Sequence, residues 1–234
     1  MENLIILHGW YSSKEKWEKV KRIVEGEGIK VFIEDLPGFK EENKISKPWD
    51  LSNYVKWLED LIEEKKKSGD LAGPFFLLGH SFGGRIAINF SVKRTSDLKG
   101  LILVSSAGIR SRNESICKTA SFLSKLSFLP GYSFFRKVFY KFIIGKTDYL
   151  NAKGEMKETF KLIIREDLTS LLSKINVETL ILWGEKDKFT PVSDAYLMDK
   201  EIPNSNLEVI EGVGHTPYLE NPHVLANRIV KFIK

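Results

Sequence analysis

Short apolar runs recur along the chain, and between them lie longer segments with apolar residues at every third or fourth position. The short runs are apolar almost throughout, which is typical of strands in a parallel sheet covered on both faces. The longer segments have the period of amphipathic helices. The pattern predicts strands over 4–7, 30–34, 75–78, 101–104, 180–183 and 207–210. It predicts helices over 14–27, 51–68, 83–93, 193–200 and 222–233.

Strands and helices alternate except over residues 107–177, where the pattern is helical and no strand is expected. Such alternation predicts a mainly parallel sheet with right-handed crossovers and helices on both faces. The exceptional segment is far longer than an ordinary connection between two strands. We therefore predict an α/β core formed by residues 1–106 and 178–234, with a helical cap inserted over 107–177.

The composition is that of a globular protein, with 42% hydrophobic and 29% charged residues in 234. No apolar run approaches the roughly 20 residues that cross a bilayer, and no cleavable leader is visible, so we expect no stable membrane insertion. Cys117 is the only cysteine and cannot form an internal disulfide, which fits the cytoplasmic location that we expect.

The net charge of +5 is modest, and the basic excess is concentrated between residues 110 and 146, where Glu114 is the only acid. Such a run is most often a solvated helix face, although it can also attract an anionic substrate or a membrane surface. Because the signs nearly balance elsewhere, we predict no nucleic-acid partner.

The most specific local motif is Gly79-His80-Ser81-Phe82-Gly83, which joins a predicted strand to a predicted helix. In this context Gly-x-Ser-x-Gly is a nucleophile elbow, whose strained turn lifts the serine hydroxyl above the sheet. The glycines are needed because side chains there would collide with the neighbouring strand and helix. We therefore predict Ser81 as the catalytic nucleophile.

A serine hydroxyl needs a base to take its proton, and the chain has four histidines. His215 lies in a glycine-rich loop between the last predicted strand and the last helix, at the same sheet edge as the elbow. We predict that it is the base. His8 is expected to brace its own loop, His80 to point away from the serine, and His223 to be solvated or packed in the last helix.

The base in turn needs a carboxylate that orients the imidazole and stabilises its protonated form. Asp187 follows the predicted strand 180–183 after a glycine turn, and we predict that it is this acid. Glu185 in the same loop is the alternative. The loop after strand 101–104 has no acid to offer.

Hydrolysis of an acyl group passes through an oxyanion that needs preorganised N–H donors. We predict that these are the backbone N–H groups of Phe82, directly after the nucleophile, and of Trp10, in the loop after the first strand. Rings of the phenylalanine-rich cap are candidate pocket residues, namely Phe122, Phe135 and Phe139. The alternative is that these rings only pack the cap helices together.

Five motifs resemble the hallmark motifs of the α/β-hydrolase superfamily. They are Gly79-His80-Ser81-Phe82-Gly83-Gly84, Leu7-His8-Gly9-Trp10, Asp35-Leu36-Pro37-Gly38-Phe39, Gly184-Glu185-Lys186-Asp187, and Gly214-His215 with Glu220-Asn221-Pro222. The order Ser81, Asp187, His215 along the chain is also that of this superfamily. The chain looks similar to its carboxylesterases and its pimeloyl-carrier-protein methyl ester esterases, in which His-Gly-Trp also occurs.

The resemblance implies a three-layer α/β/α hydrolase fold that needs no cofactor, with the Trp10 side chain bordering the pocket. No metal site is predicted. Members of the superfamily usually have two antiparallel strands before the His-Gly loop, whereas only seven residues precede His8 here. We therefore expect a six-stranded sheet that lacks the usual first two strands.

These expectations describe a serine hydrolase, most simply a carboxylesterase that forms an acyl-Ser81 intermediate. Its partner would be a small-molecule ester with a short- to medium-chain apolar acyl group. Two alternatives stay open: hydrolysis of a carbon–carbon bond in a diketone-like substrate, and a non-catalytic ligand-binding receptor on the same fold. Haloalkane dehalogenase and epoxide hydrolase activities are excluded, because these enzymes of the fold use an aspartate where this chain has Ser81.

Overall fold

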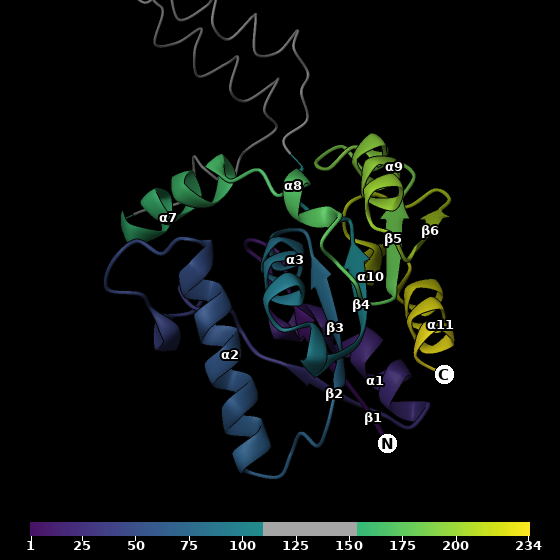
Figure 1. The fold of residues 1–234 in the computed structure, drawn as a ribbon, viewed down its shortest axis with the longest axis horizontal. Coiled ribbons are helices and arrows are strands. Elements are labelled where there is room, and N and C mark those ends of the chain that lie inside the picture. Colours follow the sequence, from purple (N-terminus) through teal and green to yellow (C-terminus); the bar gives the residue numbers. More distant parts are fainter. Residues whose placement is uncertain (110–153) are drawn as a thin grey trace, which may run out of the picture.

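The computed structural model describes residues 1–109 and 154–234. Within them six strands form one parallel sheet (Figure 1). The strands are β1 (Glu2–Leu7), β2 (Ile29–Ile33), β3 (Phe75–His80), β4 (Leu98–Val104), β5 (Thr179–Gly184) and β6 (Ser205–Ile210). Their order across the sheet is β2-β1-β3-β4-β5-β6. The six-stranded parallel sheet predicted from the apolar runs is therefore confirmed.

Helices cover both faces of this sheet and complete a three-layer arrangement. One face carries α2 (Leu51–Lys67), α3 (Phe82–Lys93), α8 (Thr169–Leu172) and α9 (Val192–Glu201). The other carries α1 (Glu18–Gly26), α10 (Pro217–Glu220) and α11 (Pro222–Ile233). Short 3₁₀ turns lie in the connections: η1 (Lys14–Trp17), η2 (Glu41–Asn43) and η3 (Thr95–Asp97).

The central strand β3 shows how a continuous apolar run serves two cores. Phe75 and Leu77 pack on the side of α2 and α3, whereas Phe76 and Leu78 pack on the side of α1 and α11. Successive side chains of a strand point to opposite faces, so each core receives every second residue. This double coverage explains why β3 has no polar alternation in the sequence.

The return segment of the predicted cap is held to the core by a buried arginine. It contains α7 (Gly154–Arg165) and α8, and in Figure 1 α7 lies above the start of α2. Arg85 of α3 donates from Nη1 to the carbonyl oxygens of Ile163 and Glu166, at 3.1 and 2.9 Å. Burial lowers the pKa of Arg85 to about 10, so the guanidinium stays charged at neutral pH.

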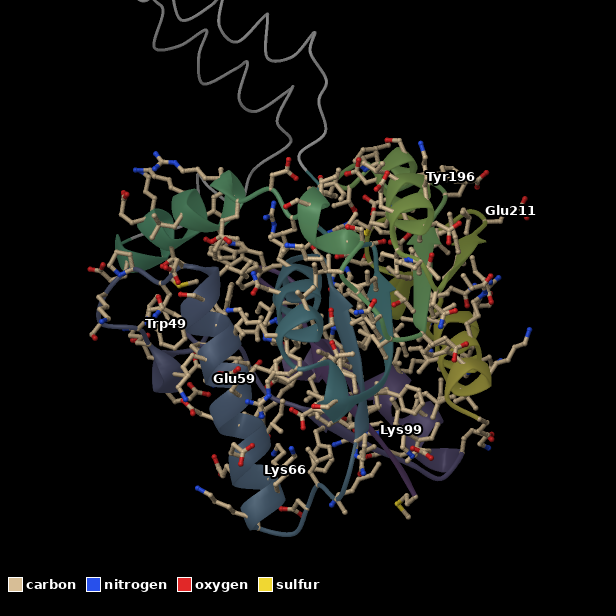
Figure 2. The ribbon with its side chains drawn as sticks, viewed as in Figure 1. Trp49, Glu59, Lys66, Lys99, Tyr196 and Glu211 are labelled. Atoms are coloured by element: carbon tan, nitrogen blue, oxygen red, sulfur yellow. The ribbon has the colours of Figure 1, made fainter. Side chains whose placement is uncertain are left out.

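A second link joins α7 to the residues before α2. The main-chain N–H of Trp49, marked in Figure 2, donates to Thr159 Oγ1 at 2.9 Å.

The cap boundaries 107–177 stay a prediction. The basic run 110–146 and the candidate pocket residues Phe122, Phe135 and Phe139 lie outside the described residues.

Candidate active site

The strand order brings three distant loops to one edge of the sheet. All six strands are parallel, so the segments that follow β3, β5 and β6 leave the sheet at the same carboxyl edge. Ser81 directly follows β3, Asp187 comes shortly after β5, and His215 lies between β6 and α10. The topology thus places the three predicted residues on one side of the sheet.

Ser81 occupies the strained turn that the elbow motif predicts. Its φ of 51° and ψ of −111° lie outside the regions that L-residues ordinarily adopt. Two residues on, Gly83 approaches the first loop so closely that an added Cβ would collide with the carbonyl oxygen of Leu7 and lie 2.8 Å from that of His8. The turn therefore needs a glycine at position 83, because the chain has no room there for a side chain.

A chain of hydrogen bonds joins Ser81, His215 and Asp187. His215 Nε2 lies 3.0 Å from Ser81 Oγ, and His215 Nδ1 lies 2.8 Å from Asp187 Oδ2. A carboxylate only accepts, so Nδ1 carries the proton and Nε2 is free to accept one from the serine hydroxyl. The Asp187 side chain is fully buried, while that of His215 remains 16% exposed. A proton can therefore pass from Ser81 Oγ to His215 Nε2 in this geometry.

The Asp187 carboxylate is held by four donors. Oδ1 accepts from the main-chain N–H groups of Phe189 and Thr190 at 2.8 and 3.0 Å, and Oδ2 accepts from Thr190 Oγ1 at 2.8 Å as well as from His215. Burial alone would raise the pKa of Asp187, but His215 and the Thr190 donors outweigh it and lower the pKa below its ordinary value. Asp187 is thus ionised and fixed in orientation at neutral pH.

Glu185, the alternative acid, makes a different contact. Its Oε2 accepts from the main-chain N–H of Gly212 at 2.9 Å, in an exposed part of the loop. The geometry therefore brings Asp187, and not Glu185, to the imidazole of His215.

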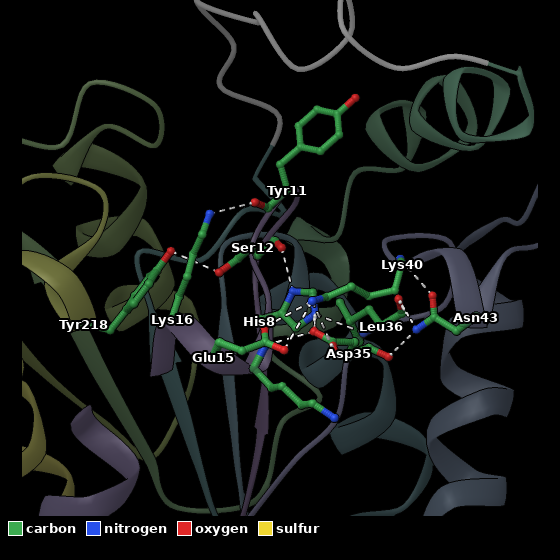
Figure 3. Close-up of polar contacts among 12 residues, drawn as sticks. His8, Tyr11, Ser12, Glu15, Lys16, Asp35, Leu36, Lys40, Asn43 and Tyr218 are labelled. Carbon is green, nitrogen blue, oxygen red and sulfur yellow. Dashed lines mark hydrogen bonds and ion pairs between the residues drawn. The ribbon is translucent and has the colours of Figure 1, made fainter. Parts of the chain in front are cut away.

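The loop after β1 is braced by His8, as the sequence predicts (Figure 3). His8 Nε2 accepts from the main-chain N–H of Leu36 at 2.9 Å, and Nδ1 donates to the carbonyl of Gly9 at 2.8 Å. Burial is the main cause that lowers the pKa of His8, so the ring is neutral and keeps this tautomer. Asp35 accepts from the main-chain N–H of Lys14 at 2.9 Å.

The same contacts orient the peptide between Gly9 and Trp10. The Gly9 carbonyl accepts from His8 Nδ1 and, at 3.1 Å, from the main-chain N–H of Ser12. This peptide is trans, so its N–H, which belongs to Trp10, points the opposite way. Within the described residues the Trp10 N–H donates no hydrogen bond, and the Phe82 N–H is an unpaired group at the start of α3.

An aromatic cluster lies beside these two N–H groups. The Trp10 ring makes edge contacts with Phe39, Phe82 and Phe160, at centroid distances of 4.9, 5.3 and 5.0 Å. Phe160 belongs to α7, so the return segment of the predicted cap contributes to this aromatic cluster. Of the candidate pocket residues, Trp10 is therefore placed next to the elbow. Phe39 was not among them, because nothing in the local sequence distinguishes it from a core residue.

Two polar residues beside the site make contacts that the sequence does not predict. Thr190 contacts both Asp187 and His215, although a threonine before a proline reads as part of a turn. His80 does not contact Ser81 through a ring nitrogen, in line with the expectation that it points away. Its Nε2 instead lies 2.8 Å from the main-chain carbonyl oxygen of His215.

Residues 1–109 and 154–234 hold no group of three or more His, Cys, Asp or Glu side chains placed to bind a metal ion. Over the same ranges, no helix has both the length and the apolar character required to cross a bilayer.

Comparison with known proteins points to one family. The Alpha/beta hydrolase family matches residues 4–228. Monoacylglycerol lipase ABHD6 of Mus musculus is 28% identical, in a match that covers 99% of this chain and 75% of the lipase. Pimeloyl-[acyl-carrier protein] methyl ester esterase of Wigglesworthia glossinidia brevipalpis is 26% identical and covers 99% and 93%. The esterase EaEST of Exiguobacterium antarcticum has the same fold, with a TM-score of 0.76 at 23% identity over 100% and 92% of the two chains.

Proposed function

The chain belongs to the alpha/beta hydrolase family, and on this premise we propose that it is a serine esterase with Ser81 as nucleophile, His215 as base and Asp187 as orienting acid. The observation that carries the proposal is the continuous hydrogen-bond chain from Ser81 through His215 to Asp187. Relatives that are lipases and esterases support an ester substrate.

In the acylation step that we propose, Ser81 Oγ attacks the carbonyl carbon of the ester while His215 Nε2 takes the hydroxyl proton. The resulting imidazolium is stabilised by the buried Asp187 carboxylate, which stays ionised because its pKa is lowered. His215 then returns the proton to the departing alcohol oxygen, which leaves an acyl-Ser81 ester. A water molecule repeats the sequence in the second step, releasing the carboxylic acid and restoring the Ser81 hydroxyl.

The negative charge on the tetrahedral oxygen needs donors that are already oriented. We assign this role to the main-chain N–H groups of Phe82 and Trp10. The Phe82 N–H follows the nucleophile at the start of α3, where the helix dipole also favours negative charge. The Trp10 N–H is directed by the two hydrogen bonds that hold the Gly9 carbonyl. Each donor of this kind typically contributes about 3 kcal/mol to catalysis.

The aromatic wall of Trp10, Phe39, Phe82 and Phe160 supports an apolar acyl group. Rings next to the acyl carbon favour hydrocarbon over charged substituents, because a charge would lose its hydration there. We therefore propose short- to medium-chain carboxylic esters as the substrate class.

A series of p-nitrophenyl esters tests this function directly. We expect turnover of the acetate, butyrate and octanoate, a fall for the palmitate, and no turnover by Ser81→Ala. If the purified protein hydrolyses none of these esters, the proposal is wrong. Cleavage of a vinylogous diketone without ester hydrolysis would identify a carbon–carbon hydrolase, and binding of substrate without turnover would indicate a receptor.

A further inference from the structure

His80 lies between the two loops that flank Ser81. It is the last residue of β3, and its ring is buried against Trp17 and Tyr218, at centroid distances of 5.8 and 4.9 Å. On one side, its Nε2 lies 2.8 Å from the carbonyl oxygen of His215. On the other side, a Cβ at Gly9 would lie 2.7 Å from His80 Nδ1. The His80 ring thus separates the loop that holds His215 from the loop that holds Gly9 and Trp10.

The hydrogen bond defines the tautomer of this histidine. A carbonyl oxygen accepts only, so His80 Nε2 must carry the proton and donate it. Nδ1 is then an unprotonated nitrogen, and it is buried with no hydrogen-bond partner among the described residues. Burial and the nearby His215 lower the pKa of His80 to about 3, so the ring stays neutral through the ordinary pH range. His80 can therefore hold the His215 loop without adding a positive charge beside His215.

The hydrogen bond is made to the main chain of His215, and the two imidazole rings also lie side by side, with centroids 5.1 Å apart. Fixing the His215 carbonyl limits the rotation of the backbone from which the His215 side chain projects. The same ring packs against Gly9, whose carbonyl is part of the peptide that presents the Trp10 N–H. One rigid side chain therefore sets the spacing of the proton acceptor and one oxyanion donor around Ser81.

We propose that His80 is a positioning residue of the hydrolytic reaction: its Nε2–H holds the His215 main chain, and its ring fixes the distance between the His215 loop and the Gly9 loop. This inference rests on the proposed esterase function. The residue acts through His215 and the Trp10 peptide and touches no reacting atom itself. Its loss should consequently lower kcat more than it changes KM for a small ester.

Paired substitutions separate the hydrogen bond from the bulk of the ring. His80→Phe and His80→Leu remove the donor, whereas the amide nitrogen of His80→Gln has about the same reach as Nε2. We expect the first two to lower kcat for p-nitrophenyl butyrate about tenfold to a hundredfold, with KM changed less than about threefold. His80→Gln should recover most of kcat. His223→Gln, an exposed position in α11, is the matched control.

A donorless variant that retains kcat within about threefold of the parent would overturn the proposal. So would an equal loss in Phe, Leu and Gln variants, since only packing would then matter. Melting temperatures identify variants that lose activity by unfolding, and in that case the Gln rescue decides the outcome.

A second measurement does not depend on hydrolysis. With four histidines in the chain, ¹⁵N-histidine spectra can be assigned by substitution, in parent protein and in Ser81→Ala alike. We expect the proton of His80 on Nε2 from pH 5 to 8, and that of the neutral His8 ring on Nδ1. A His80 proton on Nδ1 would refute the proposed hydrogen bond even in an active esterase. If the protein hydrolyses no ester and the spectra are as expected, the esterase function fails while the His80 contact stands.

Discussion

The Nε2 atom of His215 lies 3.0 Å from the hydroxyl oxygen of Ser81, although 134 positions separate the two residues along the chain. The contact exists because β3 and β6 run parallel in one sheet, so the loops that follow them leave at the same edge. Transfer of the serine proton to the imidazole in the proposed reaction depends on this distance. It also depends on Asp187, which holds the far side of the same imidazole.

Replacing Asp187 by Asn should lower kcat by a factor of about 10⁴, because an amide can favour the wrong imidazole tautomer. Glu185→Gln is the matched control, since Glu185 accepts from Gly212 and does not reach His215. Steady-state hydrolysis of p-nitrophenyl butyrate measures both. A large loss in the Glu185 variant with little loss in the Asp187 variant would reverse the assignment.

Gly83→Ala should destabilise the fold by about 1–3 kcal/mol, because the new methyl group collides with the backbone of Leu7 and His8. The activity should fall as well, since these residues lead into the loop that holds Trp10, the proposed oxyanion donor. Gly26→Ala, in α1, is the control: nothing lies within 4 Å of the added Cβ, so stability should rise by up to about 1 kcal/mol. Urea unfolding measures the difference, and equal stabilities of the two variants would contradict the packing described for the elbow.

Thr190→Val removes the hydroxyl that donates to Asp187 Oδ2 while keeping the shape of the side chain. We expect kcat to fall severalfold and the free energy of unfolding to fall by about 1 kcal/mol. Thr190 helps to lower the pKa of Asp187, so the pKa of Asp187 should be higher in the variant than in the parent. When the pH is lowered, the variant should therefore lose the stability contributed by ionised Asp187 at a higher pH than the parent does. Thr95→Val, before β4 at the opposite edge, is the control. If kinetics and acid unfolding of Thr190→Val equal those of the parent, the Thr190 hydroxyl does not position Asp187.

Because the pKa of Asp194 in α9 is raised, we expect the stability of the protein to decrease as the pH rises. Burial, and then the charge of Asp187, raises its pKa to about 6 from an ordinary value of 3.8. Between these two values the unfolded chain releases a proton that the folded protein keeps, so folding becomes less favourable as pH rises from about 4 to 6. Asp194→Asn should therefore be more stable than the parent at pH 7, by on the order of 1–3 kcal/mol.

The stability advantage of Asp194→Asn should shrink toward pH 4, where Asp194 is protonated in the folded parent too. Asp60→Asn, at an exposed position on α2, is the matched control for the loss of a carboxylate. Denaturation at pH 4, 5, 6 and 7 measures both variants. A constant difference between the parent and Asp194→Asn over this range would contradict the raised pKa.

Local patterns were sufficient for the sheet and the elbow. The strands follow from apolar runs, and the strained turn at Ser81 is predicted because it needs glycine at neighbouring positions. The His80 contact with the His215 carbonyl could not be predicted, since it joins residues 135 positions apart and involves a main-chain atom that any residue would provide. The contact of Phe160 with Trp10 was missed for a similar reason. The spacing of apolar residues along a helix is the same whether a phenylalanine among them lines a site or packs in a core.

The proposed role of Ser81 can be tested by the site and rate of labelling with a fluorophosphonate, which forms a phosphonyl ester with an activated serine and releases fluoride. We predict stoichiometric modification of Ser81 in the parent protein, located by mass spectrometry of peptides, together with complete loss of ester turnover. His215→Ala should be labelled slower by orders of magnitude, because the residues of the proposed triad would act as a unit. Labelling at another residue, or ester hydrolysis that persists in Ser81→Ala, would show that Ser81 is not the nucleophile.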